Sequence, residues 1–236
     1  RTYNSIRNII VASVVQVVSM LIGLVLRTYF IKYLGNEYLG MNSLFMSVLN
    51  IISMTEMGFT TVAVVSLYQP IAQNDRKKLV SYVVYYRKVY LVIAGLTLLL
   101  GLALTPFLDV LVNTDEDIQG LVLYYWLFVL YSAVSYLSNY KLLVIQASQK
   151  EYLISKQWMY VNITFTVIQI VCMWLFRSYV IYLLLMIGER FFSNYMASRK
   201  VKLIYPDFSL KDAGKLGKEE RTAIWKDIYS NFTYKL

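Results

Sequence analysis

The amino-acid sequence predicts an all-α, polytopic membrane protein with six transmembrane helices. Its composition is the first observation behind this prediction: of the 236 residues, 58% are hydrophobic and only 16% are charged. An average soluble domain carries about 25% charged residues. The second observation is that the hydrophobic residues gather in long runs separated by charges. A chain with so little charge cannot cover its own surface in water, so the sequence predicts a lipid environment.

A transmembrane helix needs about 20 mostly apolar residues, and six runs in the sequence meet this requirement. The first run contains no charged residue between 9 and 26, whereas Glu189 and Arg190 interrupt the last run. In chain order the predicted spans are 8–30, 39–68, 89–108, 120–143, 153–176 and 179–197.

The positions of Lys and Arg predict the orientation of the spans, because positively charged loops stay in the cytoplasm. Most of the 23 basic residues fall near the two ends of the chain and in the loops after the second and fourth spans. The loop after the third span instead carries Asp109, Asp115, Glu116 and Asp117. We therefore expect a multi-pass protein of the cell membrane with both ends of this fragment in the cytoplasm. The net charge of +9 then reflects topology and suits membrane lipids, and we expect no nucleic-acid binding.

The segment 199–236 is the most polar part of the chain, and we separate it from the six-helix lobe 1–198 as a cytoplasmic linker. The apolar residues on one side of its last helix are Ile224, Trp225, Ile228 and Phe232. Such a stripe suits a helix in the membrane interface, and a surface helix leading into a further span has the same pattern. We favour the second interpretation, with a second lobe beyond the linker.

Polar side chains inside the spans indicate which helix faces point at protein or water rather than lipid. At about 100° per residue, they form stripes on the first, second, fourth and fifth spans. The third span is nearly bare, so we expect it to face lipid or protein. We expect the four spans with polar stripes to surround a shared cavity that holds the substrate. Its candidate lining residues are Gln16, Arg27, Asn42, Asn50, Glu56, Asn139, Asn162, Gln169, Glu189 and Arg190.

Charged residues within the spans need a physical explanation, because an ionised side chain at the bilayer centre costs at least about 2.5–3.5 kcal/mol. Glu56, Glu189 and Arg190 either pair with groups on neighbouring helices or border an aqueous cavity. Arg27, near the outer end of the first span, either extends to the interface or offers a phosphate two parallel hydrogen bonds.

Two absences from the sequence exclude whole classes of chemistry. The chain has no histidine, which excludes Ser-His-Asp hydrolysis and histidine-ligated zinc. Its single cysteine, Cys172, excludes an internal disulfide. We expect neither a metal nor a cofactor at the site.

The stretch 27–79 carries a resemblance to a known family. The motifs are Arg27, Leu34-Gly35, Leu39-Gly40, Glu56-Met57-Gly58, Leu67-Tyr68-Gln69-Pro70 and Asn74-Asp75. In this order and spacing they resemble the Wzx-type polysaccharide flippases of the multidrug/oligosaccharidyl-lipid/polysaccharide exporter superfamily. The resemblance implies a two-lobe flippase fold of which this chain is the amino-terminal, six-transmembrane-helix lobe. It also implies that Arg27 and Arg190 face the diphosphate of an undecaprenyl carrier.

The leading functional hypothesis is a transporter that moves an undecaprenyl-diphosphate-linked oligosaccharide from the cytoplasmic to the outer leaflet by alternating access. Its coupling ion would be H⁺ or Na⁺, with Glu56 as the coupling or gating carboxylate. A cation-coupled drug efflux pump of the same superfamily is the alternative, with Glu56 as cation and proton site. A membrane-embedded glycosyltransferase that uses Asp115, Glu116 and Asp117 is a third hypothesis, although we expect no enzyme.

Cysteine accessibility labelling tests the predicted topology. With Cys172 replaced by Ala, single cysteines placed at 115–117 are expected to react with an impermeant maleimide from outside the cell, since acidic loops are not retained in the cytoplasm. Control cysteines at 77 and 150 are expected to react only after the membrane is opened. Labelling of 115–117 from the cytoplasmic side alone would contradict the orientation.

Overall fold

The computed structural model describes residues 2–108, 112, 119–205, 214 and 216–235, with only the backbone described for 2, 3, 5, 51–58, 204 and 231–235. Within these ranges all regular structure is helical and there is no strand. Several of the helices are long and apolar. The predicted class, an all-α polytopic membrane protein, is therefore confirmed.

The helices follow the predicted spans closely in chain order. They are α1 (Thr2–Leu34), α2 (Asn36–Ala72), α3 (Arg76–Leu104), η1 (Thr105–Phe107), α5 (Leu121–Tyr136), α6 (Asn139–Ala147), α7 (Tyr152–Phe176), α8 (Tyr179–Ile204) and α9 (Lys218–Lys235). α1, α2 and α8 extend a few residues beyond the predicted ends, because polar residues next to an apolar run continue the helix. α3 differs more, since it begins at Arg76, well before the predicted start at 89, and takes in the basic segment that the prediction placed in a loop.

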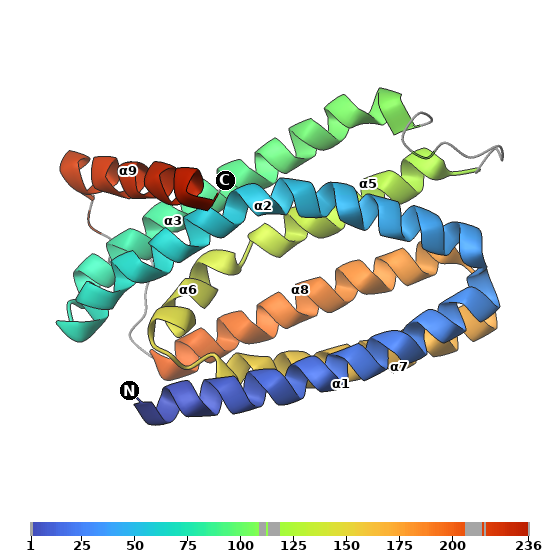
Figure 1. The fold of residues 1–236 in the computed structure, drawn as a ribbon, viewed down its shortest axis with the longest axis horizontal. Coiled ribbons are helices and arrows are strands. Elements are labelled where there is room, and N and C mark those ends of the chain that lie inside the picture. Colours follow the sequence, from blue (N-terminus) through green and yellow to red (C-terminus); the bar gives the residue numbers. More distant parts are fainter. Residues whose placement is uncertain (1, 109–111, 113–118, 206–213, 215, 236) are drawn as a thin grey trace.

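The long helices lie side by side in a bundle (Figure 1). α1 packs along α7, α7 along α8, and α8 along α5; beyond α5 the bundle continues with α3 and then α2. One hydrophobic cluster around Leu67 and Tyr86 joins α2, α3, α6 and α9. A second cluster around Phe30, Phe128 and Leu183 joins α1, α2, α5 and α8. α8 therefore lies between α7 and α5 in the middle of the bundle.

The predicted span 120–143 is not one continuous helix, because the chain bends by 44° between α5 and α6. Asn194 of α8 lies at the bend, and its Nδ2 donates to the carbonyls of Val134 at 3.2 Å and Ser135 at 3.4 Å. In an unbroken helix these carbonyls would accept from backbone N–H groups four residues later. An unsatisfied carbonyl in a membrane costs several kcal/mol. The Val134 carbonyl also accepts from the Leu137 N–H at 3.3 Å. The amide of Asn194 therefore adds a donor to each of the two carbonyls and stabilises the bend.

Three helices in the described part of the chain are long and apolar enough to cross a membrane: Ile6–Leu34, Arg76–Phe107 and Tyr152–Phe176. The bent pair α5 and α6 makes a fourth if it forms one span. α2 and α8 run alongside these helices (Figure 1). Glu189 and Arg190 reduce the hydropathy of α8, and only Phe59–Ala72 is described as an apolar helix in α2. That α2 and α8 span the membrane stays a prediction.

Apolar side chains cover the outer faces of α1, α3 and α7. The exposed ones include Val14, Val17, Met20, Leu21, Leu24, Leu91, Val92, Leu96, Leu99, Leu102, Val167, Val171, Trp174 and Leu175. A continuous surface of this kind is rare on a protein that faces water. The opposite face of α3 packs on α2 and α5, so α3 meets protein on one side and presents apolar side chains on the other.

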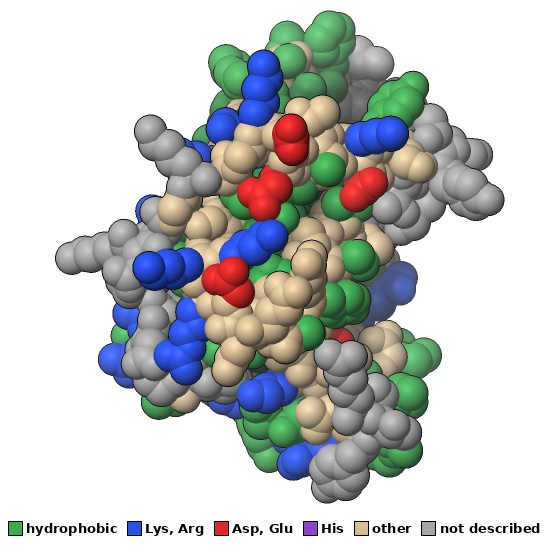
Figure 2. Space-filling model, turned by 90° about the vertical axis from the view of Figure 1, so that its left-hand side faces the viewer, with side chains coloured by type: hydrophobic (Ala, Val, Ile, Leu, Met, Phe, Trp, Pro, Cys, Tyr) green, Lys and Arg blue, Asp and Glu red, His purple; other side chains and the backbone are tan. Residues whose placement is uncertain are grey.

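Lys and Arg gather at one end of the bundle, where α1 begins, α2 meets α3 and α8 ends (Figure 2). The exposed basic residues at this end include Arg7, Arg76, Lys77, Lys156, Arg199 and Lys202. The positive-inside rule assigns this end to the cytoplasm, and that orientation stays a prediction. The predicted acidic outer loop with Asp109 and 115–117 lies outside the described residues.

α9 lies across α2 and α3 at the same end (Figure 1). Its Ile224 is buried in the cluster around Tyr86, and Lys78 Nζ lies 3.3 Å from Glu220 Oε1. The indole N–H of Trp225 donates to the Tyr85 hydroxyl at 2.9 Å. The apolar stripe predicted near the end of the chain thus packs partly on the bundle. The division at 198 stays a prediction, and α8 itself continues to Ile204.

α3 and α5 are in close contact at Gly101. The carbonyl oxygen of Gly101 accepts a hydrogen bond from the Tyr125 hydroxyl at 3.0 Å. A Cβ atom added to Gly101 would lie 2.7 Å from Cγ1 of Val129, which is closer than two carbon atoms can approach. This contact requires glycine, because a side chain would push the two helices apart.

We predict that Gly101→Val lowers the unfolding free energy by about 1–3 kcal/mol, because a side chain forced into a packed contact displaces its neighbours. Gly95→Val is the matched control on the same helix, since a Cβ there meets nothing within 4 Å. Thermal unfolding in detergent measures both variants. Equal shifts in the melting temperature would contradict the close contact at Gly101.

Candidate site: a polar cavity inside the helix bundle

A polar cavity of about 210 Å³ lies among α1, α5, α7 and α8. Polar side chains from all four helices reach it, together with a few apolar ones. Its lining residues are Val15, Ser19, Tyr131, Trp158, Met159, Asn162, Met186, Glu189, Arg190 and Ser193. A cavity with two ionisable side chains within an apolar bundle is the default location of a transported substrate or ion.

Glu189 reaches the cavity on the side of α7. Its Oε1 accepts a hydrogen bond from Asn162 Nδ2 at 3.3 Å. The positive charge of Arg190 also acts on this carboxylate. A partly buried carboxylate needs such partners, because a charge without a partner loses hydration without compensation. Asn162 therefore holds Glu189 at the boundary between α7 and α8.

Arg190 reaches the other side of the same cavity, toward α5. Its Nη2 donates to the Tyr131 hydroxyl at 2.6 Å, and its Cζ lies 5.1 Å from the centre of the Tyr131 ring. Consecutive residues on a helix point about 100° apart. Glu189 and Arg190 thereby bind the two neighbours of α8, one on each side. Each residue pairs with a neighbouring helix, as the first explanation predicts, and also lines a cavity. That the cavity is aqueous stays a prediction.

The cavity combines functional groups that suit a polar, uncharged or anionic ligand. Trp158 and Tyr131 supply aromatic faces, while Ser19, Ser193 and the Asn162 amide donate and accept hydrogen bonds. Guanidinium groups bind phosphate oxygens with two parallel hydrogen bonds. Aromatic rings beside hydroxyl and amide groups provide the flat apolar surface and the polar partners that a sugar ring needs.

Three of the predicted lining residues meet at this cavity: Asn162, Glu189 and Arg190. Gln169 lies on the same helix as Asn162 and is buried, although it does not line the cavity. Gln16 and Arg27 are exposed on α1, outside the lining. Ser19, one turn beyond Gln16, is the residue of α1 that contributes a hydroxyl.

The predicted residues of the second and fourth spans lie elsewhere. Asn42 Oδ1 accepts from the Tyr179 hydroxyl at 3.4 Å, and Asn50 is exposed. Asn139 begins α6 after the bend, and the Glu56 side chain is outside the described part. The sequence predicts that the second span, α2, lines the cavity. In the structure α8 lines it and α2 does not. The reason is that α8, not α2, packs between α5 and α7.

Sequence reasoning missed the polar stripe of α8. Ser193 and Asn194 follow Glu189 and Arg190 by four residues each, which places them on the same helix face. Ser193 lines the cavity and Asn194 holds the bend. The sequence analysis selects Glu189 and Arg190 as lining residues but not Ser193 and Asn194, although their spacing of four residues is visible in the sequence.

The cavity contains a single carboxylate, and in the described part of the chain no three His, Cys, Asp or Glu side chains gather as a metal site would require. The chemistry available at the cavity is therefore hydrogen bonding, ion pairing and stacking on aromatic rings.

An apolar helical bundle that encloses charged, hydrogen-bonded side chains is typical of a membrane transport protein. Residues 9–175, more than half of the chain, match the MatE family model, and the chain belongs to the MatE family. Members of this family are membrane transporters and not enzymes. The superfamily implied by the resemblance around Arg27–Leu79 is thereby confirmed. No curated protein and no solved structure matches the chain.

Gln157 of α7 is a buried amide without a partner among the described residues. Its side chain is 6% exposed, and neither Oε1 nor Nε2 has a hydrogen-bond partner there. Asn194 is similarly buried at 5% exposed, yet it makes two hydrogen bonds to the bend. The two amides therefore allow a direct comparison of a satisfied and an unsatisfied polar group.

We predict that Gln157→Met raises the unfolding free energy by roughly 1 kcal/mol, because it removes an unpaired polar group at similar volume. Asn194→Leu is expected to lower it by about 1–3 kcal/mol, because the carbonyls at the bend lose the two hydrogen bonds from the Asn194 amide. Thermal unfolding in detergent compares the two variants. A loss of stability in Gln157→Met as large as in Asn194→Leu would show that Gln157 has a partner.

Proposed function

We propose that this MatE-family protein is a flippase of the Wzx type. It moves an undecaprenyl-diphosphate-linked oligosaccharide from the cytoplasmic to the outer leaflet by alternating access, for polysaccharide biosynthesis. The observation that carries the proposal is the polar cavity in which Arg190, Trp158 and Asn162 meet. The resemblance of residues 27–79 to this group of flippases supports the same substrate.

The chemistry of the cavity favours an anionic, sugar-bearing headgroup. Arg190 is a planar donor held by Tyr131, so its orientation is fixed before a ligand arrives. A preorganised guanidinium recognises a phosphate better than a mobile lysine ammonium does. The Trp158 ring and the hydroxyls of Ser19 and Ser193 then remain for the sugar.

Drug efflux, the second function known for the superfamily, finds support in two residues of the cavity. Glu189 and the ring of Trp158 are groups that attract a cation. Arg190 lies in the same lining and repels it, so the cavity has no net negative charge to hold a cationic drug. We therefore place the flippase first. In this proposal Glu189 joins Glu56 as a candidate carboxylate for the coupling ion, H⁺ or Na⁺.

Export of the lipid-linked oligosaccharide in a strain deleted for the gene tests the proposal. Variants Arg190→Lys and Glu189→Gln are compared at matched membrane abundance. Arg190→Lys is expected to reduce export by about tenfold, because lysine keeps the charge but loses the two parallel hydrogen bonds. Glu189→Gln keeps the hydrogen bond to Asn162 and removes the charge, so a loss of ion dependence identifies the coupling carboxylate.

Two further variants serve as comparisons. Lys156→Ala, on the exposed surface of α7, is expected to export like the wild type. Arg27→Lys tests the other arginine that the resemblance assigns to the diphosphate. Wild-type export by Arg190→Lys and Glu189→Gln would contradict the proposed site. Export of cationic drugs without any accumulation of lipid-linked oligosaccharide in the deletion strain would favour the efflux pump.

A further inference from the structure

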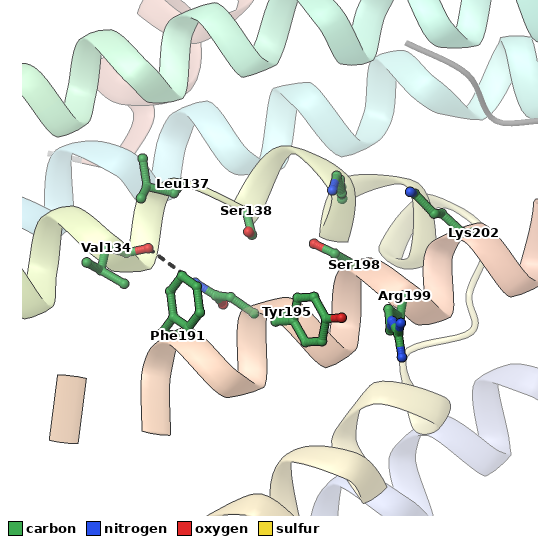
Figure 3. A pocket seen from close by; sticks show the side chains of 10 residues that line it. Val134, Leu137, Ser138, Phe191, Tyr195, Ser198, Arg199 and Lys202 are labelled. Atoms are coloured by element: carbon green, nitrogen blue, oxygen red, sulfur yellow. Dashed lines mark hydrogen bonds between the residues drawn. The ribbon is translucent and has the colours of Figure 1, made fainter. Parts of the chain in front are cut away.

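A second and larger cavity, of about 500 Å³, lies between the bend of α5 and α6 and the last turns of α8 (Figure 3). It shares no lining residue with the polar cavity inside the bundle. Its lining residues are Val134, Leu137, Ser138, Lys141, Phe191, Asn194, Tyr195, Ser198, Arg199 and Lys202.

The two ends of this cavity differ in chemistry (Figure 3). Val134, Leu137 and Phe191 lie at one end, and Arg199 and Lys202 lie at the other. Along α8, the step from 191 to 202 corresponds to about 16 Å. The basic end lies toward the Lys- and Arg-rich end of the bundle, and the apolar end lies deeper among the helices.

No carboxylate among the described residues balances the positive charges at the basic end. Lys141, Arg199 and Lys202 form no ion pair with a described residue, and the lining contains no carboxylate. The charges of Lys202 and Arg87 both act unfavourably on Lys141. Lys200, the neighbour of Arg199, differs because it donates to the Leu153 carbonyl at 2.6 Å. Like charges gathered in one cavity favour an anion between them.

The backbone around the cavity is fixed without a ligand. Asn194 holds the carbonyls of Val134 and Ser135 at the bend, and the bend separates α6 from the line of α5. The cavity also opens sideways, because Leu137 is 48% exposed and Phe191 is 63% exposed. A molecule can therefore reach it from the surrounding membrane without a change in the helix packing.

We propose that this cavity binds an anionic membrane phospholipid. Its phosphodiester lies between Lys141, Arg199 and Lys202 with the hydroxyls of Ser138 and Ser198, and an acyl chain lies along Leu137 and Phe191. The order of charge and apolar surface matches a lipid of the leaflet nearest the basic end, with its headgroup outward and its chain inward. A small soluble anion would use the basic end and leave the apolar end uncovered. The site is separate from the transport cavity and does not depend on the proposed substrate.

Native mass spectrometry of the purified full chain in detergent tests the site. Phosphatidylglycerol and phosphatidylcholine with the same acyl chains are added in parallel titrations. The site variant combines three substitutions, Lys141→Ala, Arg199→Ala and Lys202→Ala. The control variant removes the same charge from exposed positions at the same end of the bundle, with Lys77→Ala, Lys156→Ala and Lys226→Ala.

We expect the site variant to bind phosphatidylglycerol at least about tenfold more weakly, because each basic residue near an anionic headgroup contributes to binding. The control variant is expected to bind like the wild type, and phosphatidylcholine is expected to bind weakly to all three. Equal losses in both triple variants would overturn the proposal, since binding would then follow overall charge. Displacement of phosphatidylglycerol by millimolar inorganic phosphate would also overturn it, in favour of a site for the free anion.

A second measurement uses only the wild-type chain and so does not require that the variants fold. Phosphatidylglycerol with a photoreactive diazirine in the acyl chain is expected to label peptides that contain Leu137 or Phe191. A diazirine in the headgroup is expected to label peptides that contain Arg199 or Lys202. Labelling that is unrelated to these segments, or the reverse order of the two probes, would overturn the proposed orientation.

Discussion

The position of α8 between α5 and α7 is the constraint on which the rest of the structure depends. Three polar side chains of α8 hydrogen-bond to these neighbours: Glu189 with Asn162, Arg190 with Tyr131, and Asn194 with the backbone at the bend. In apolar surroundings a polar group without a partner is costly. A shift of α8 by one residue would turn it by about 100° and break all three contacts. Its depth and rotation are therefore fixed, and both cavities are defined by them.

The contacts of α1 explain how one helix can be so exposed and still belong to the bundle. At its start, Asn8 donates to the Gln149 carbonyl at 3.1 Å and accepts from the Tyr152 N–H at 2.9 Å. At its end, Gly35 has φ +99, which only glycine adopts readily, and this turn directs the chain into α2. Between these two points α1 packs along α7 and exposes the rest of its surface. Ser19 lies on the packed side and reaches the polar cavity.

The helices could be predicted from the sequence because long apolar runs report directly on helix length. Which helices are neighbours could not be predicted from the sequence. Periodicity shows which face of a helix is polar, but it does not show which helix lies opposite that face. Asn162 and Glu189 were both predicted as lining residues, yet only the structure shows that they meet. Asn42 belongs to an equally polar face and lies against Tyr179 instead. The bend after Tyr136 left no trace in hydropathy, because the donor that permits it, Asn194, is far away in the sequence.

The electrostatics of the two cavities indicate different uses. In the inner cavity the guanidinium and the carboxylate already have protein partners, so its charges are partly compensated when no ligand is bound. A ligand then gains only the difference between its own contacts and those it replaces, which favours reversible binding. In the outer cavity three cations have no counter-charge among the described residues, although Arg199 and Lys141 lie over the rings of Tyr195 and Tyr140. An anion therefore displaces no carboxylate and is attracted by all three. Reversible binding in the inner cavity suits the headgroup of the proposed substrate. A stronger attraction in the outer cavity suits the proposed phospholipid, which stays bound next to α8.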